Sequence, residues 1–266
     1  TLSHVMTDIS ILLGASRLLG EPIYIFGDDA KDYFNQLPIA PEDWWKLGVV
    51  FIHAPADDAV VGRPPDVPAA RLFFISERRL GFGARASSNI AQRFSEALLF
   101  ILRQDMDAAE ARLPVDTRPS AVEWRRQRDA VSGRAGDPQS HQHRLWSIHM
   151  YCDDPIFIVV GVQRTLRLLR LWRALTQDSG LLMAIAEKRN LGTWAPWLGV
   201  LLCAGLGLVI VPKVKLLRTS DRLIAVLKPR PATEFSEYRA LMGMLEHLRC
   251  VNCAPRSVMY GLYKPH

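Results

Sequence analysis

The stretch that decides the fold runs from Ile148 to Val160 and reads IHMYCDDPIFIVV. It places two adjacent carboxylates, Asp153 and Asp154, inside an apolar run. Apolar runs of this length are typical of buried strands, and a buried carboxylate without a partner is costly. The stretch therefore predicts two short strands that meet at an acidic turn, together with a group that neutralises the turn.

Two further aspartate doublets show what is distinctive about this turn. Asp57-Asp58 lies in the turn-rich segment HAPADDAVVGRPPD and is most simply a solvated turn. Asp28-Asp29 ends the apolar strand IYIF, so it sits at a strand end as Asp153-Asp154 does. Acids at the ends of different strands can hold Mg²⁺, a hard cation that takes oxygen ligands. Two such ions serve phosphoryl transfer in many enzymes, so metal is the predicted neutralising group.

Composition and charge set the broad class of the protein. The chain has 266 residues, 49% hydrophobic and 23% charged, which is typical of a globular protein with one large domain or two modest ones. The net charge of +6 favours polyanionic partners such as nucleic acid, although many basic proteins bind none. Four cysteines argue against a secreted disulfide scaffold and predict an intracellular protein of the cytoplasm or nucleus.

One uncharged segment, from Leu191 to Pro212, is long enough to span a bilayer. Glycines and Pro196 interrupt any helix there. The pieces WLGVLL and LGLVIV, on either side of Ala204-Gly205, instead predict two strands and a turn. The prediction is therefore a buried hairpin and no membrane partner.

Hydrophobic periodicity predicts the other elements. We expect a helix over residues 3–19, a strand in EPIYIFGDD, and two more strands in DWWKLGVVFIHAP and ARLFFISERRL. A helix of about fifteen residues follows, marked by apolar positions from Ile90 to Leu102. Residues 103–145 are polar and predict a helical, partly flexible insertion that reaches solvent. Another amphipathic helix is expected around Phe235 to Leu245.

The helix expected from about Gln163 to Ser179 carries two kinds of face. Leu166, Leu169 and Trp172 are predicted to form its apolar face. Arginines recur every three residues along another face, at positions 164, 167, 170 and 173. Such a stripe is either a solvated face or a contact to a nucleic-acid backbone, and the sequence leaves both open.

The segment DDAKDYFNQLPI, from Asp28 to Ile39, resembles the first palm motif of the reverse transcriptases of retroelements, within the right-hand polymerase group. That motif usually reads Asp-x-Lys-Asp-Ala-Phe, followed by x-x-Ile-Pro. The resemblance implies that Asp29 is the first metal-binding aspartate and that the Ala30 carbonyl is an additional metal oxygen. A register that uses Asp28 is the alternative, and the Lys-Asp and Leu-Pro spacings favour Asp29.

The same match implies a site for the incoming nucleotide. Asp32 and Tyr33 would lie near its triphosphate. Phe34 occupies the bulky position that resembles the steric gate, which clashes with a ribose 2′-OH and so selects deoxynucleotides. The resemblance thus implies dNTP substrates and disfavours RNA-directed RNA synthesis.

The segment RRLGFGARASSNIAQRF, residues 78–94, resembles the second motif, commonly Leu-Pro-Phe-Gly-x-x-x-Ala-Pro before Phe-Gln. Phe82 and Gly83 would then pack beside the incoming base and the template. The positions that depart from this pattern are Gly81, Ser88 and Ala91, which replace two prolines and the aromatic residue.

The opening stretch, in MYCDDPIFIV, is similar to the family's Tyr-x-Asp-Asp hairpin. This makes Asp153 the partner of Asp29 in metal binding and Asp154 the second carboxylate of the pair. Tyr151 would face the primer end. Pro155 is unusual directly after the doublet, because proline removes a hydrogen-bond donor from the returning strand.

Two later segments complete the resemblance. LLMAIAEKRNLG resembles the fourth motif, in which Lys188 would protonate the pyrophosphate leaving group. WAPWLGVLL fits the Leu-Gly hairpin that grips the primer, around Trp197, Leu198 and Gly199. Residues 233–264 look like the first thumb helices of LTR and DIRS-like elements.

The resemblance implies an α+β fold: a right-hand polymerase palm, an antiparallel sheet backed by helices, with a small helical thumb region. Residues 1–212 would form the palm with partial fingers, and 213–266 the thumb or connection helices. The basic fingers strands would precede residue 1, so we expect an incomplete polymerase.

The implied activity is RNA-directed DNA polymerisation, with a dNTP added to a primer 3′-hydroxyl on an RNA or DNA template with two Mg²⁺ ions, or Mn²⁺. The alternative is a decayed or domesticated relative that binds nucleic acid without polymerising. Other candidate sites are weaker. His141 and His143 are expected to be solvated, and Cys250-x-x-Cys253 to be structural, since zinc needs four ligands.

Overall fold

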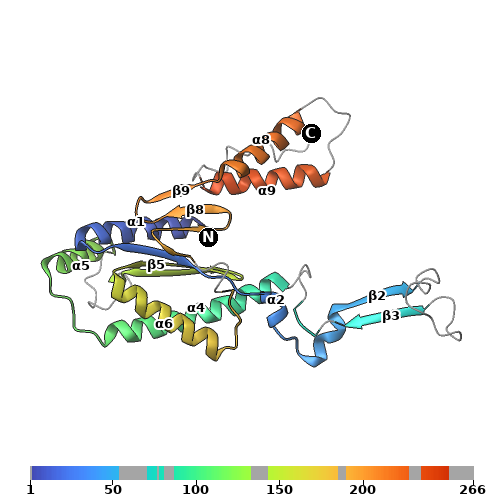
Figure 1. Ribbon diagram of the computed structural model, residues 1–266, viewed down its shortest axis with the longest axis horizontal. Coiled ribbons are helices and arrows are strands. Elements are labelled where there is room, and N and C mark those ends of the chain that lie inside the picture. Colours follow the sequence, from blue (N-terminus) through green and yellow to red (C-terminus); the bar gives the residue numbers. More distant parts are fainter. Residues whose placement is uncertain are drawn as a thin grey trace.

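The computed structural model describes residues 2–53, 71–76, 78–80, 87–132, 143–184, 190–227 and 235–251. Its centre is an antiparallel sheet with helices packed on both faces, which confirms the predicted α+β class with a helix-backed antiparallel sheet (Figure 1). A hairpin of two strands extends from one end of the molecule, and a pair of helices near the C-terminus lies to one side of the sheet (Figure 1).

The central sheet has the strand order β4-β5-β1-β6. Its strands are β1 (Ile23–Gly27), β4 (Trp146–Tyr151), β5 (Asp154–Val160) and β6 (Asn190–Gly192), each antiparallel to its neighbour. β5 lies inside the sheet and is buried from Pro155 to Val160 on both faces. This double burial explains why IFIVV is continuously apolar instead of alternating.

One face of the sheet packs against α1 (Leu2–Leu19) and α5 (Pro119–Ser132). The apolar residues of α1 recur at helical spacing. Among them, Val5, Ile9 and Leu12 lie in one buried cluster with Ile25 and Ile158 of the sheet. The same cluster includes β7 (Trp194–Trp197) and β8 (Val200–Cys203). The helix predicted over residues 3–19 is therefore present, and it covers the sheet.

The other face packs against α4 (Ser87–Ala111) and α6 (Val162–Asp178). Phe157 is the centre of this cluster: its ring stacks on Phe26 at 4.5 Å between centroids and lies 5.3 Å from Trp172. The predicted apolar face of α6 was partly wrong. Leu168 and Trp172 are buried, whereas Leu166 is exposed, because the buried positions follow an i, i+4 spacing.

The remaining elements lie outside the central sheet. They are α2 (Tyr33–Gln36), the 3₁₀ helix Pro41–Leu47, β2 (Gly48–His53), β3 (Arg71–Ser76), β9 (Leu208–Ile210), α8 (Lys213–Leu227) and α9 (Phe235–Val251). β2 and β3 pair as an antiparallel hairpin, and α8 packs against α9.

Two expectations about the middle of the chain need correction. α4 has 25 residues, not about fifteen, because Met106 continues its buried face through an otherwise charged segment. Residues 103–145 contain helix as expected, the end of α4 and all of α5, but α5 packs against α1 and buries Ala121 and Trp124 in the core instead of extending into solvent. Residues 133–142 lie outside the described part of the chain.

The uncharged segment after residue 190 is a three-stranded antiparallel sheet, β7-β8-β9, as the strand prediction required. WLGVLL is not one strand, because Leu198 (φ 47°) and Gly199 (φ 72°) turn the chain between β7 and β8. Within the described residues, no helix is both long and apolar enough to cross a membrane.

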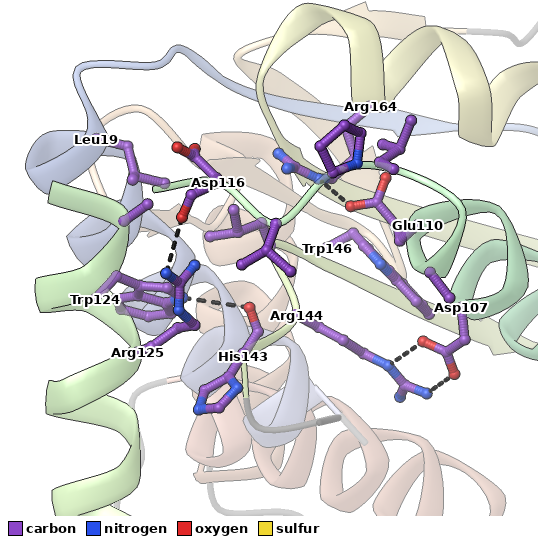
Figure 2. A pocket seen from close by; sticks show the side chains of 16 residues that line it. Leu19, Asp107, Glu110, Asp116, Trp124, Arg125, His143, Arg144, Trp146 and Arg164 are labelled. Carbon is purple, nitrogen blue, oxygen red and sulfur yellow. Dashed lines mark hydrogen bonds and ion pairs between the residues drawn. The ribbon is translucent and has the colours of Figure 1, made fainter. Parts of the chain in front are cut away.

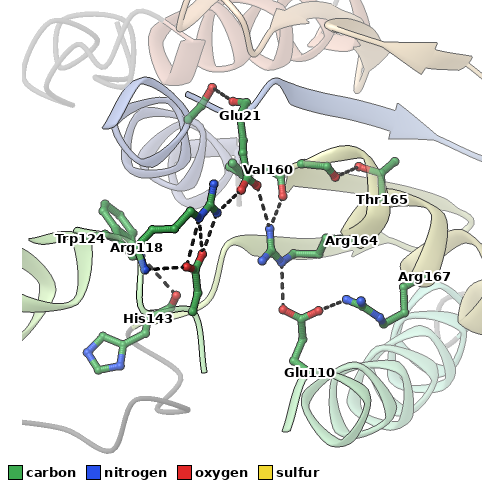
Figure 3. A network of polar contacts seen from close by, with 12 residues as sticks. Glu21, Glu110, Arg118, Trp124, His143, Val160, Arg164, Thr165 and Arg167 are labelled. Atoms are coloured by element: carbon green, nitrogen blue, oxygen red, sulfur yellow. Dashed lines mark hydrogen bonds and ion pairs between the residues drawn. The ribbon is translucent and has the colours of Figure 1, made fainter. Parts of the chain in front are cut away.

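The arginine stripe of α6 is divided between two environments. Arg164 and Arg167 both bind Glu110 of α4, with 2.9 Å between Arg164 Nε and the carboxylate (Figure 3). Arg164 also lies 3.7 Å from Glu21, which binds Arg118 in turn. The first two arginines of the stripe thus join α4 and α6 to the loop before β1, while the other two are exposed.

Candidate functional site: an acidic turn at the end of the central sheet

The acidic turn joins the edge strand β4 to β5. Tyr151 pairs with Asp154, which leaves Cys152 and Asp153 as the two turn residues. Cys152 has φ 51°, a left-handed conformation that non-glycine residues seldom adopt. The predicted strand-turn-strand arrangement of IHMYCDDPIFIVV is confirmed.

Asp29 lies next to this turn. The Ala30 amide donates to the Asp153 carbonyl at 3.2 Å, and the Asp28 amide donates to the Pro155 carbonyl at 3.4 Å. These bonds hold the backbone of Asp29 against the turn, although 124 residues separate Asp29 from Asp153. The two strand ends that the sequence singled out therefore meet in space.

Pro155 explains where the β1–β5 ladder ends. In an antiparallel ladder, every second pair of facing residues is a hydrogen-bonded pair, in which each residue donates to the other. Asp28 donates to Pro155, but Pro155 has no N–H to return the bond. Regular pairing stops at Gly27–Ile156, one residue before the acids. The proline thus ends the ladder at the point where Asp29 meets the turn.

Asp28 has a structural environment that sets it apart from Asp29. Its side chain is buried and accepts a hydrogen bond from Trp172 Nε1 at 3.1 Å. Its other oxygen accepts from the Asp29 amide at 3.2 Å. Asp29 is half-buried, so its carboxylate is the more accessible of the two. This supports the register that places Asp29, and not Asp28, in the site.

The residues expected near a nucleotide divide into two groups. Asp32 is exposed with φ 48°, and Phe34 is half-buried with its ring 6.0 Å from that of Tyr33. The Tyr33 side chain is buried and its hydroxyl lies 2.7 Å from Ser95 Oγ. Only the backbone of Tyr33 could reach a triphosphate, because its side chain points toward α4.

Tyr33 also accounts for two departures from the motif patterns. It stands where the first motif has alanine, and Ala91 stands where the second motif has an aromatic residue. Both belong to one buried cluster, and the Tyr33 hydroxyl reaches the Ala91 carbonyl at 3.1 Å. The large Tyr33 ring thus packs against the small Ala91 in this cluster.

Gln36 and Gln92 support the site; both lie inside the quoted motif segments, although no role was predicted for either. Gln36 bonds both backbone groups of Leu182, at 2.6 Å to the amide and 3.0 Å to the carbonyl. Gln92 of α4 accepts from the Cys152 amide at 2.9 Å. Such contacts join residues far apart in the chain, so local sequence patterns give no signal for them.

The predicted primer-binding residues lie beside the turn. Tyr151 is exposed at the end of β4. Trp197 is buried, and its indole N–H donates to the Asp154 carbonyl at 2.9 Å. Leu198 and Gly199 form the turn that follows, and Lys215 Nζ of α8 lies 3.4 Å from the Gly199 carbonyl. Trp197 therefore connects the β7–β8 hairpin to the acidic turn.

Three predicted residues, Phe82, Gly83 and Lys188, lie outside the described part of the chain. Across the ranges that the structure describes, no three histidine, cysteine, aspartate or glutamate side chains gather as a metal site. Magnesium commonly takes only one or two protein carboxylates, with water and substrate phosphates as the other ligands. The all-oxygen donors Asp29, Asp153 and Asp154 fit that chemistry.

A pocket at the other end of β4 has a different character (Figure 2). Its arginines have partners within the pocket: Arg144 binds the Asp107 carboxylate, and Arg125 donates to the backbone carbonyl of Asp116 at 2.8 Å. His143 was expected to be solvated, and this was wrong. Its side chain is buried and its Nε2 lies 2.7 Å from Asp129. These contacts join α4, α5 and β4 and are structural.

Comparisons with known proteins give structural likenesses alone. No family model and no curated protein matches the sequence. A foamy viral protease-reverse transcriptase in complex with double-stranded DNA is 13% identical, with a TM-score of 0.48 over 92% of this chain and 32% of that chain. Telomerase from Candida albicans, in complex with a fragment of telomeric RNA, is 10% identical, with a TM-score of 0.43 over 94% of this chain and 43% of that chain. This chain therefore spans less than half the length of either protein.

Proposed function

We propose that this chain is the palm of an RNA-directed DNA polymerase of a retrotransposon-like element. The observation that carries the proposal is the backbone contact between Ala30 and Asp153, which brings Asp29 beside the Asp153–Asp154 turn. Two acidic strand ends that match polymerase motifs in the sequence thereby become neighbours. The pairing of β1 with β5 sets this meeting, and the proposal rests on the fact that both of the acidic strand ends that match the motifs lie at the same end of that pair.

In the proposed reaction, Asp29, Asp153 and Asp154 would hold two Mg²⁺ ions, with the Ala30 carbonyl as a further oxygen ligand. The metal ions would supply activation of the primer hydroxyl and charge stabilisation at the transferred phosphoryl group. The chain would contribute positioning, since the acids are fixed by backbone bonds to two adjacent strands.

Other residues take roles around this centre. Phe34 would exclude a ribose 2′-OH, with Asp32 and the backbone of Tyr33 near the triphosphate. Phe82 and Gly83 would pack beside the incoming base, and Lys188 would protonate the pyrophosphate. Tyr151, with the Trp197–Gly199 turn, would hold the primer end. Tyr151 is exposed at the end of β4, and Trp197 donates to the Asp154 carbonyl.

Primer extension on poly-rA with oligo-dT and dTTP tests the proposal. We expect Mg²⁺-dependent product from the wild type and loss of about 100-fold or more for Asp153→Asn, because a ligand of the reactive centre is removed. Asp105→Asn is the matched control, since it removes an exposed acid from α4. Its product yield should equal that of the wild type.

The competing function is nucleic-acid binding without polymerisation. It predicts that the wild type binds the template–primer but forms no product that depends on Asp153. Filter binding in parallel with extension separates the two functions. Binding with no Asp153-dependent product would overturn the polymerase proposal.

A further inference from the structure

Cys152, the first residue of the acidic turn, is held by α4 at each of its polar groups. Its amide donates to Gln92 Oε1 at 2.9 Å, and its carbonyl accepts a short hydrogen bond from Ser95 Oγ. Its thiol lies 3.9 Å from the Ser88 carbonyl. A non-glycine residue with φ 51° needs such surroundings to remain in place. The conformation of the turn therefore depends on α4 as well as on the sheet.

Ser95 has more acceptors within reach than it has protons. Its Oγ lies 3.0 Å from the Ala91 carbonyl and also contacts the Cys152 carbonyl. A hydroxyl carries one hydrogen, so it donates to only one of these at a time. What directs that hydrogen toward Cys152 is the remaining neighbour, Tyr33.

The Tyr33 hydroxyl lies 2.7 Å from Ser95 Oγ and 3.1 Å from the Ala91 carbonyl. The Tyr33 hydroxyl favours the Ser95–Cys152 bond when it donates to Ser95, the nearer of its two acceptors. Ser95 then cannot donate back to the Tyr33 oxygen, so its one hydrogen is left for a carbonyl. Of the two carbonyls within reach, that of Cys152 is nearer to Ser95 Oγ than that of Ala91.

We propose that Tyr33 is a positioning residue, whose hydroxyl acts through Ser95 to fix the Cys152–Asp153 turn. The Tyr33 and Ser95 side chains are both buried, so water does not replace the contact. Burial raises the pKa of Tyr33 to about 12, with a smaller contribution from the charge of Asp153, so the hydroxyl keeps its proton near neutral pH. The segment that holds Asp29 is thereby joined to the turn by side chains as well as by the sheet.

Hydrogen exchange of the Cys152 amide, followed by NMR or by mass spectrometry of a peptide spanning the turn, tests this proposal without reference to activity. Tyr33→Phe preserves the ring and should speed exchange about fivefold, the factor expected for one neutral buried hydrogen bond. Ser95→Ala should do the same. The double variant should exchange no faster than Ser95→Ala alone, because both changes break one path.

Tyr24→Phe is the matched control, since it removes a tyrosine hydroxyl from β1 and should leave the exchange unchanged. A thermal unfolding scan of each variant separates local loosening from loss of the fold. Exchange in Tyr33→Phe equal to the wild type would overturn the proposal, and so would additive effects in the double variant.

The consequence for activity rests on the proposed function. If the chain polymerises, Tyr33→Phe should lower kcat with little change in the KM for dTTP, because it displaces Asp153 and not the nucleotide. If primer extension gives no product that depends on Asp153, the exchange experiment still decides whether Tyr33 holds the turn.

Discussion

Asp28 and Asp29 are adjacent in the chain and have opposite surroundings. Asp28 is buried with Trp172 Nε1 at 3.1 Å from its carboxylate, whereas Asp29 is half-buried beside the Asp153 turn. The Trp172 ring also fills the core next to Phe157. One side chain therefore both packs the core and supplies a hydrogen bond to a buried acid.

One substitution tests these two roles of Trp172 together. Trp172→Phe keeps an aromatic ring but removes a donor to a buried carboxylate, so we expect the free energy of unfolding to fall by about 2–4 kcal/mol. Trp194→Phe, on exposed β7, is the matched control and should cost less than about 0.5 kcal/mol. Urea unfolding measures both. Equal stability of the two variants would contradict a stabilising role of the Trp172 indole, both in the core and as a donor to Asp28.

At the residue scale, the sequence predicted the acids better than their supports. Asp29 and Asp153 follow apolar strands and match a motif, so their meeting could be expected. Gln92 lies inside the second motif segment and Ser95 directly follows it, but nothing in that segment indicates their contacts with Cys152, which is 60 and 57 residues away. No local pattern encodes such a contact.

Asp8 provides a polar contact between α1 and β4. Asp8 of α1 accepts hydrogen bonds from His149 Nε2 at 2.8 Å and from Ser147 Oγ. Burial raises the pKa of Asp8, but the hydrogen bonds from His149 and Ser147 outweigh it, so the pKa lies below its ordinary value of 3.8. A carboxyl whose pKa is lower in the folded state stabilises the fold above its unfolded pKa.

The sign of this linkage gives a pH prediction. Asp8→Asn should be less stable than the wild type at about pH 5, and the difference should shrink as the pH falls through 3.8 and then through the lowered pKa. Urea unfolding at intervals from about pH 5 to pH 2 measures it, with exposed Asp105→Asn as the control. A difference that stays constant over this range would contradict the assignment.

At the element scale, length and burial were harder to predict than type. α1 and β5 carry strong periodic or continuous apolar patterns and were found where expected. α4 extends past its apolar positions because Met106 alone keeps the buried face, among the acids of its last turns. α5 carries Trp124 in a mainly polar sequence, so the sequence did not predict that this helix packs on α1.

At the scale of the whole molecule, the C-terminal helices reach the acidic turn through one hairpin. Lys215 of α8 contacts the Gly199 carbonyl, and Trp197 of the same hairpin bonds the Asp154 carbonyl. α9 also meets the core, where Val251 is buried in the cluster around α1. The hairpin is thus the polar link between the predicted thumb region and the candidate site.

Lys215 is the residue through which this link can be tested. A Lys215→Met substitution keeps an unbranched side chain but removes the ammonium, so α8 loses its bond to the hairpin while the central sheet is untouched. We expect a broader distance distribution between spin labels on α1 and α8, measured by pulsed electron resonance, and an unchanged unfolding midpoint of the sheet. Lys213→Met, at the exposed start of α8, is the matched control and should keep the wild-type width. If Lys215→Met also keeps that width, then the burial of Val251 against α1 suffices to place the C-terminal helices, and the hairpin does not fix their position.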